Sequence, residues 1–283
     1  MPSTSFQRWC VLLFFLLYGV AALWHLTLRE PYDLRVEHAR IPLEGWAAEA
    51  RPVRVLLLAD WHAGQWEADW VDRIVRTAQE QKPELILLLG DYRNAVTYRF
   101  SMSPQEIAQR LAPLKTTAPV FYVTGNHEIG SWAGQLHHAF EGVGFVNLEK
   151  KTYRLSFGEG QELDMRGVSY YGGSHRKYFP KNEPPGPPLL AVVHDPLDFL
   201  RLKIRTAAVV AGHTHGGQIC YPDGTPVHKP DFGWTREMQR TGLRRAKAGQ
   251  PLYVSRGLGS SILPMRMNCP PEISVLEFVG TAP

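Results

Sequence analysis

The order of hydrophobic and polar positions after residue 50 predicts alternating strands and helices. Short apolar runs at Val53–Ala59, Glu84–Leu89 and Val120–Val123 have the length and composition of buried strands. Between them, Ala68–Gln81 and Pro104–Leu114 place their apolar residues on one face, which is the spacing of amphipathic helices. Strand, helix, strand, helix, strand is the pattern of a parallel α/β unit.

The second half of the chain is richer in strands and contains two long polar stretches. Further strands are predicted at Phe145–Leu148, Thr152–Phe157, Glu162–Val168, Leu189–Val193, Ala207–Ala211, Leu252–Val254 and Ile273–Phe278. Gly172–Pro188 and Tyr221–Ala248 are predicted to be loops. Ser103 is expected to cap the second helix, with Glu106 in its first turn. The chain contains no internal repeat, so we expect one α/β domain over residues 51–283.

The first feature of the chain is a long apolar run at residues 9–28, WCVLLFFLLYGVAALWHLTL. It contains no charged residue, and a helix of this length spans about 30 Å, the thickness of a bilayer core. Trp9 and Trp24 lie towards its ends, and Arg8 and Arg29 flank it. A cleaved signal peptide and a buried core helix are the alternatives, but no small-x-small cleavage site follows the run. We therefore expect an uncleaved transmembrane anchor.

Residues 29–50 are interpreted as a connector, within which Tyr32–Ile41 could instead form an initial strand. The basic residues beside the anchor bear on its orientation. One precedes the apolar run and three follow it, namely Arg8 and then Arg29, Arg35 and Arg40. The positive-inside rule then places the large domain in the cytoplasm, on a small difference in charge.

Composition narrows the class of protein further. Hydrophobic residues make up 44% and charged residues 20% of the 283 residues, as in an ordinary folded protein. The net charge of +4 without a run of like charges does not indicate a nucleic-acid binder, and none is predicted as a partner. Cys10, Cys220 and Cys269 form no C-x-x-C pair. A Cys220–Cys269 disulfide is open, but two reduced thiols are favoured.

Polar residues follow the predicted strands at the point where each strand ends. The positions are Asp60 and His62, Asp91, Asn126 and His127, His194, and His213 and His215. Ligands bind beyond the carboxyl ends of the strands in an open α/β sheet, so these side chains should converge. Each alone is explained as a turn former, a helix cap or a packed histidine. Together, their oxygen and imidazole groups suit two divalent ions such as Mn²⁺, Fe²⁺ or Zn²⁺.

The chain contains five motifs in this order: D-x-H, G-D, G-N-H-E, H-D-P and G-H-T-H-G-G-Q. With these motifs, residues 53–279 resemble the calcineurin-like metallophosphoesterase superfamily. The N-terminal anchor, the extended motif at 213–219 and the segment at 254–259 narrow the resemblance. They are similar to a membrane-associated bacterial branch. This branch contains phosphodiesterases and an alternative UDP-2,3-diacylglucosamine pyrophosphatase of lipid A synthesis.

The resemblance implies a four-layer α/β/β/α sandwich with two mixed sheets and two divalent ions, with Mn²⁺ expected first. It implies that one ion is held by Asp60, His62 and His215, the other by Asn126, His194 and His213, and that Asp91 bridges them. A metal-bridging hydroxide would attack phosphorus, and His127 would act at the leaving-group oxygen. A single-pass protein of the bacterial inner membrane is implied as well.

Two residues depart from the family pattern without removing a ligand. Trp61 stands between Asp60 and His62 where Leu is expected, and its side chain should point away from the metals into packing or towards the membrane. Glu128 ends the G-N-H-E motif where Asp is commoner. It could orient His127 or lie at the surface.

The substrate is expected to be a phosphorylated small molecule or a lipid-linked phosphoester, with UDP-2,3-diacylglucosamine as the leading hypothesis. A broad-specificity extracytoplasmic phosphodiesterase or phosphatase and an inactive metal-binding module are the alternatives. Four apolar residues could touch acyl chains, although core packing is favoured for them: Ile262, Leu263, Met265 and Met267. Four basic residues could hold phosphate or form a solvated surface: His175, Arg176, Lys177 and Arg256.

Overall fold

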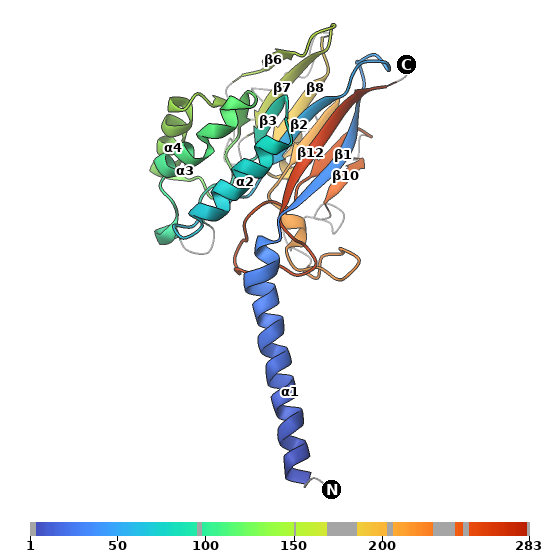
Figure 1. The fold of residues 1–283 in the computed structure, drawn as a ribbon. Coiled ribbons are helices and arrows are strands. Elements are labelled where there is room, and N and C mark those ends of the chain that lie inside the picture. Colours follow the sequence, from blue (N-terminus) through green and yellow to red (C-terminus); the bar gives the residue numbers. More distant parts are fainter. Residues whose placement is uncertain are drawn as a thin grey trace.

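The computed structural model describes residues 4–94, 98–149, 151–168, 186–202, 206–228, 241–245 and 249–281. Two mixed six-stranded sheets pack face to face (Figure 1). The first has the order β1-β12-β2-β3-β4-β5, with bounds Arg35–Leu43, Glu272–Gly280, Val53–Leu58, Leu85–Leu88, Val120–Tyr122 and Val146–Asn147. The second has the order β10-β11-β9-β8-β7-β6, with bounds Gly242–Arg245, Pro251–Val254, Ala208–Ala211, Leu189–Val193, Glu162–Val168 and Tyr153–Ser156.

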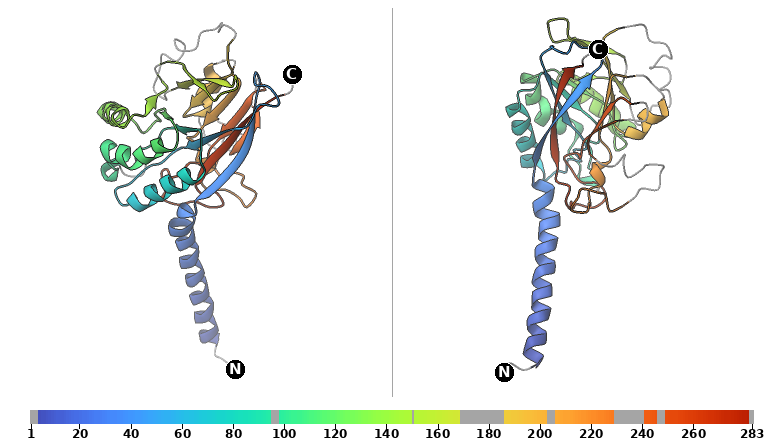
Figure 2. Two further views of the ribbon diagram at one scale, coloured as in Figure 1. Left: turned by 45° about the horizontal axis from the view of Figure 1, so that its top comes forward. Right: turned by 90° about the vertical axis from the view of Figure 1, so that its right-hand side faces the viewer.

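Helices cover the outer faces of both sheets, which completes the predicted four-layer sandwich. The first sheet carries α2 (Ala68–Glu80), α3 (Pro104–Leu111) and α4 (Gly130–Gly142). The second carries α6 (Pro196–Leu202), through Phe199. The right-hand view of Figure 2 shows α2–α4 on one side of the two sheets and α6 on the other. The predicted α/β/β/α fold class is therefore confirmed.

The central strands are buried on both faces, because their alternate side chains pack against different layers. In β2, Leu56 and Leu58 pack under the helices, while Val55 and Leu57 pack against the second sheet. Successive side chains of a strand point to opposite faces, so an unbroken apolar run is required here. The apolar runs of β2, β3 and β8 follow from this burial.

Several elements differ from the sequence-based expectation. α4 and α6 were not predicted, and β10 lies within the stretch 221–248 that was predicted as a loop. Ser103 caps α3 as predicted, because its hydroxyl oxygen accepts a hydrogen bond from the Glu106 backbone N–H at 3.2 Å.

The N-terminal helix α1 (Thr4–Trp24) projects away from the sandwich and is exposed to solvent along its length (Figure 1). Its 21 residues span about 32 Å at 1.5 Å per residue, enough to cross a bilayer core. The helical run continues through His25–Arg29 and Glu30–Tyr32. A helix packed in a protein core is excluded, because the apolar stretch is not buried.

The stretch 29–50 contains a strand of the first sheet. β1 pairs with β12 in parallel over nine residues, from Arg35 opposite Glu272 to Leu43 opposite Gly280. β12 runs antiparallel to β2, and β2, β3 and β4 run parallel to one another. β1 therefore begins at the edge of the sheet where β2, β3 and β4 end. Helix α1 joins the sandwich at that same edge (Figure 2).

Candidate metal centre

The predicted ligands converge at the carboxyl-end edge of the two sheets. They follow β2, β3 and β4 of the first sheet and β8 and β9 of the second sheet. Three groups of ligand atoms each lie within 4.8 Å of one another: Asp60 with His62 and His215, His62 with Asp91 and His127, and Asp91 with His194 and His213. Residues up to 155 positions apart therefore share one buried site, as the strand-exit argument predicts.

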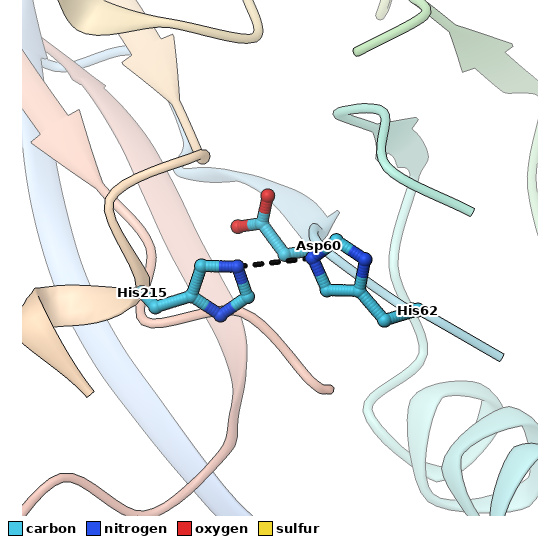
Figure 3. Close-up of side chains that lie close together, drawn as sticks. All are labelled: Asp60, His62 and His215. Atoms are coloured by element: carbon cyan, nitrogen blue, oxygen red, sulfur yellow. Dashed lines mark hydrogen bonds between the residues drawn. The ribbon is translucent and has the colours of Figure 1, made fainter. Parts of the chain in front are cut away.

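The first group brings two imidazoles and a carboxylate together (Figure 3). The Nε2 atoms of His62 and His215 are 3.0 Å apart, and their rings stack at 4.9 Å between centroids. Asp60 lies beside both rings and is fully buried. His62 Nδ1 lies 3.0 Å from the carbonyl oxygen of Arg93, so this nitrogen donates and the Nε2 lone pair faces the site.

The second group is centred on His194. Its Nε2 atom lies 3.0 Å from Asn126 Oδ1 and 3.0 Å from His213 Nδ1. Its Nδ1 atom donates to the carbonyl oxygen of Leu89 at 2.7 Å, which again turns the other nitrogen towards the site. Asn126 thus joins the cluster of histidines and carboxylates.

Asp91 lies between the two groups. Its Oδ2 atom is 3.3 Å from His194 Nε2 and 3.7 Å from His62 Nε2. A carboxylate in this position can reach an ion held by either group, which is the arrangement that two-metal sites use.

The protonation states suit metal binding. Burial lowers the pKa of His62 to about 4 and of His213 to about 3, so both are neutral lone-pair donors at pH 7. Burial raises the pKa of Asp60 to about 7. Burial opposes ionisation of Asp91 as well, but the adjacent His194 outweighs it and holds the Asp91 pKa well below its usual range. Burial lowers the pKa of His194, but Asp91 and Asp60 outweigh it and raise that pKa to about 10, so without an ion the His194 proton supplies the positive charge that a bound cation would replace. Two carboxylates in so buried a site need a compensating cation.

The donor set fits borderline divalent ions. It combines imidazole nitrogens with carboxylate and amide oxygens, which Mn²⁺, Fe²⁺ and Zn²⁺ all accept. His215 Nδ1 is buried without a hydrogen-bond partner, so the ring's placement is not explained by hydrogen bonding at that atom. Holding two imidazole nitrogens at 3.0 Å from each other is what a shared cation would require.

The backbone at the site is unusual. Five candidate ligands have positive φ: Asp60 (52°), His62 (44°), Asp91 (54°), His213 (69°) and His215 (50°). Each costs about 1–2 kcal/mol for a non-glycine residue. Such conformations persist where surrounding contacts fix them, and they cluster at functional sites. The five positive-φ residues therefore form the kind of constrained backbone that functional sites carry.

Glu128 is one of the groups that fix these turns. Its carboxylate accepts hydrogen bonds from the backbone N–H groups of Asp91 (2.8 Å), Tyr92 (3.0 Å), Arg93 (3.2 Å) and Gly125 (2.7 Å). The side chain is buried, so the predicted surface role is wrong. Glu128 instead ties the turn after β3 to the turn after β4.

His127 lies at the more open rim of the site. Its Nε2 atom is 3.8 Å from Asp91 Oδ2, and its backbone N–H donates to Asp91 Oδ1 at 3.0 Å. The ring meets that of His62 edge to face at 5.0 Å between centroids. Burial lowers the pKa of His127, which keeps the imidazole neutral. The residue is therefore adjacent to both groups and reachable from outside.

Other predicted residues have different positions. Arg256 pairs with the carboxylates of Glu37 and Glu272, so it is already neutralised. His175, Arg176 and Lys177 lie outside the described residues. Trp61 is buried in the core under the helices, which supports the packing interpretation. Cys220 and Cys269 are both free and buried, and Cys10 is exposed on α1.

The expectation of core packing is wrong for two apolar residues. Ile262 is 80% exposed and Leu263 is 49% exposed, while Met265 and Met267 are half-buried. The loop that carries them folds back on itself around Arg266 instead of entering a sheet.

Sequence reasoning missed Arg266, which is fully buried near the site. Its guanidinium donates to the carbonyl oxygens of Cys269 (2.8 Å), Arg256 (2.9 Å), Gly257 (3.3 Å) and Gly259. The Gly259 N–H donates in turn to the Asp60 carbonyl oxygen at 2.7 Å. The segment 256–259 is thereby fixed against Asp60, and no local pattern in the sequence marks Arg266 for this role.

A model of the calcineurin-like phosphoesterase family matches residues 53–217, more than half of the chain. The chain therefore belongs to the calcineurin-like phosphoesterase family, and by class it is a metal-dependent phosphoester hydrolase.

Named relatives agree with this class. Phosphodiesterase YaeI of Escherichia coli is 28% identical over 81% of this chain and 83% of its own length. The uncharacterized metallophosphoesterase YkuE of Bacillus subtilis is 28% identical over 74% of this chain and 72% of its own length. A transmembrane protein with metallophosphoesterase domain of Danio rerio is 25% identical over 85% of this chain and 56% of its own length.

Proposed function

We propose that this chain is a membrane-anchored dinuclear-metal hydrolase that cleaves phosphoester or pyrophosphate bonds of membrane-derived substrates such as UDP-2,3-diacylglucosamine. Residues 9–28 form the anchor, 29–50 join it to the sandwich, and 51–283 form the catalytic domain. The protein is a single-pass protein of the bacterial inner membrane, with the catalytic domain on the cytoplasmic side. The observation that carries the proposal is that the anchor joins the sandwich at the edge that holds the candidate ligands.

The ligands divide into two sets around a shared carboxylate. One ion is held by Asp60, His62 and His215, and the second by Asn126, His194 and His213, with Asp91 reaching both. Mn²⁺ is the first ion to test, and Fe²⁺ and Zn²⁺ suit the same donors. When bound, such ions lower the pKa of water and neutralise charge on the phosphoryl oxygens.

The protein's own groups have three tasks in this reaction. The buried imidazoles and carboxylates hold the donor atoms in place without reorganisation, which is the source of electrostatic stabilisation in such sites. His127, at the rim, donates a hydrogen bond or a proton to the departing oxygen. Glu128 holds the turn at Asp91 and the turn at Gly125 in a fixed position relative to each other.

The membrane-derived substrate follows from topology. A site at the edge where the anchor emerges faces the bilayer surface, so a phosphoester in the headgroup layer is the substrate it can reach without extraction. UDP-2,3-diacylglucosamine is named through the resemblance of the motifs. An inactive metal-binding module is disfavoured because all seven predicted ligands are present and gathered together.

A broad-specificity extracytoplasmic phosphodiesterase or phosphatase is the second candidate, and one relative is named a phosphodiesterase. It differs from the first in needing neither a nucleotide nor the cytoplasmic face. The measured side of the membrane on which the domain lies separates the two, because a nucleotide-linked lipid is available only to a cytoplasmic domain.

The test is Mn²⁺-dependent hydrolysis by the full chain in detergent micelles. Bis(p-nitrophenyl) phosphate and UDP-2,3-diacylglucosamine are assayed side by side, with Asp91→Ala as the control. Efficient release of UMP that the variant loses supports the lipid substrate. Hydrolysis of the artificial diester alone supports the second candidate. No hydrolysis of either compound with any divalent ion contradicts the proposal.

A further inference from the structure

The loop between β11 and β12 presents apolar side chains next to the anchor. Residues 261–265, called the apolar loop below, carry Ile262 at 80% and Leu263 at 49% exposure. Figure 1 shows this brown-red segment before β12 beside the upper end of α1. Exposed aliphatic side chains at a loop tip gain nothing from folding in water.

Ile262 is also strained. Its φ is 63°, in the left-handed region that glycine and asparagine occupy readily and β-branched residues avoid. The Leu263 N–H donates to the Ser261 carbonyl oxygen at 2.6 Å, which closes a tight turn around Ile262. An isoleucine here carries both strain and exposure, so its presence points to an environment other than water.

The apolar loop is held in a fixed position relative to the candidate ligands. The Gln218 side chain donates to the carbonyl oxygens of Ser261 (3.0 Å) and Leu263 (2.9 Å) and accepts from the Ser261 N–H (2.7 Å). Gln218 lies three residues after His215, in the motif that follows β9. The loop is therefore clamped by the same turn that carries a candidate metal ligand.

The residues that directly follow the apolar loop are hydrogen-bonded to the end of the apolar helix. The Arg266 N–H donates to the carbonyl oxygen of Leu26 at 3.0 Å, and the Cys269 N–H donates to Glu30 Oε1 at 2.8 Å. Glu30 Oε2 lies 3.3 Å from His25 Nε2, which links the acceptor to the last helical turns. The apolar loop and the end of the apolar helix therefore lie next to each other, at the same level along the helix axis.

We propose that Ile262 and Leu263 insert into the bilayer interface and, together with α1, hold the candidate metal edge against the lipid headgroups. The inference rests on the proposed membrane anchorage. Trp66 adds to this surface, because it is 78% exposed and follows the candidate ligands Asp60 and His62 at the same edge. Its ring packs on that of Phe100, with 5.0 Å between the ring centroids. Tryptophan is the side chain most suited to the interface.

The apolar loop lies close to the candidate ligands along the chain. The Gly259 N–H donates to the Asp60 carbonyl oxygen, and Ile262 is three positions after Gly259 in the chain. An extended chain covers at most about 10 Å over three residues. An inserted apolar loop therefore brings the ligands within roughly that distance of the lipid surface, where the phosphates of membrane lipids lie.

The first test places a fluorophore on the apolar loop of the full chain in liposomes. Ile262→Cys is labelled with an environment-sensitive NBD group in a Cys10→Ser background, because Cys220 and Cys269 are buried. The matched control is Glu44→Cys, which is exposed and follows β1 at the opposite edge of the sheet. We expect a blue-shifted emission, quenched by lipids spin-labelled near the headgroup, at position 262 alone.

Flotation of the same liposomes separates two kinds of failure. If the chain floats with the lipid but the label at 262 reports water as the label at 44 does, loop insertion is wrong while anchorage stands. If the chain does not float, anchorage is wrong and the inference falls with it. Neither result bears on hydrolysis of a soluble diester, which tests the metal centre separately.

The second test asks whether insertion serves catalysis. The double variant Ile262→Asn with Leu263→Ser retains the loop, because asparagine accepts the left-handed conformation. Its kcat/KM on bis(p-nitrophenyl) phosphate should equal that of the wild type. On hexadecyl p-nitrophenyl phosphate in vesicles it should fall about tenfold, the loss that roughly one buried aliphatic side chain accounts for. Equal kcat/KM of variant and wild type in vesicles would overturn the role in catalysis.

Discussion

Gly125 lies between Asp91 and His194, and replacing it with alanine should disrupt the site. A Cβ at this position would lie 2.7 Å from the Asp91 backbone nitrogen and 2.7 Å from His194 Cε1, and closer still to the Asp91 carboxylate. The backbone of Gly125 has no positive φ, so the effect comes from space alone. The substitution therefore tests the packing of the proposed metal centre without removing any ligand.

The magnitude follows from the contact distances. Non-bonded heavy atoms settle at about 3.5 Å, so His194 must retreat by roughly 0.8 Å and the closer Asp91 carboxylate by more. Overpacking of this kind costs about 1–3 kcal/mol in the free energy of unfolding. A misplacement near 1 Å at a catalytic site lowers the rate on the order of 100-fold. We expect both effects in Gly125→Ala.

Gly134→Ala is the matched control. Gly134 lies in the interior of α4, and a Cβ there meets nothing within 4 Å. Alanine should raise stability by about 0.5–1 kcal/mol and leave activity unchanged. The assays are urea unfolding and Mn²⁺-dependent hydrolysis of bis(p-nitrophenyl) phosphate. Wild-type activity in Gly125→Ala would refute the placement of Asp91 and His194 around a metal centre.

Three further predictions address catalysis, metal and fold separately. His127→Gln should lower kcat by about 10²–10⁴-fold while the bound metal stays at the wild-type level, and loss of metal would make His127 a ligand instead. Chelation with EDTA should lower the thermal unfolding midpoint, and Mn²⁺ should restore it. The reason is that an ion at 100 times its Kd stabilises the folded state by about 2.7 kcal/mol. An unchanged midpoint would count against buried metal binding. Ser103→Ala should cost about 1 kcal/mol in urea unfolding without changing hydrolysis, because it removes only the cap of α3; a loss of activity would show that α3 positions the site.

Much of the fold could be predicted because its strands are buried on both faces. Glu162–Val168 and Leu189–Val193 have the predicted bounds, because the first alternates polar and apolar residues and the second is an unbroken apolar run. α4 escaped prediction because it contains glycines at its ends and middle and buries only Leu136 and Phe140. β10 reads Gly-Leu-Arg-Arg, and an edge strand needs no apolar run.

The candidate site was predictable in its residues but not in its support. Strand exits place Asp60, Asp91 and His194 on one edge whatever their exact neighbours are. The left-handed turns at the ligands could not be predicted, because local preferences disfavour them for Asp and His and tertiary contacts impose them. Arg266 acts on segments that topology alone brings together, so no local pattern marks it. Gln218 belongs to the motif at 213–219, but its contacts with Ser261 and Leu263 follow only from the fold.

Anomalous X-ray scattering from Mn²⁺-soaked crystals of the full chain tests the central claim most directly. The account predicts two peaks per chain, one among Asp60, His62 and His215, and one among Asn126, His194 and His213. Both peaks should lie beside the Asp91 carboxylate, and an Asp91→Asn crystal should lose at least one of them. A single peak, or peaks away from the strand exits, would contradict a dinuclear centre at the edge where helix α1 joins the sandwich.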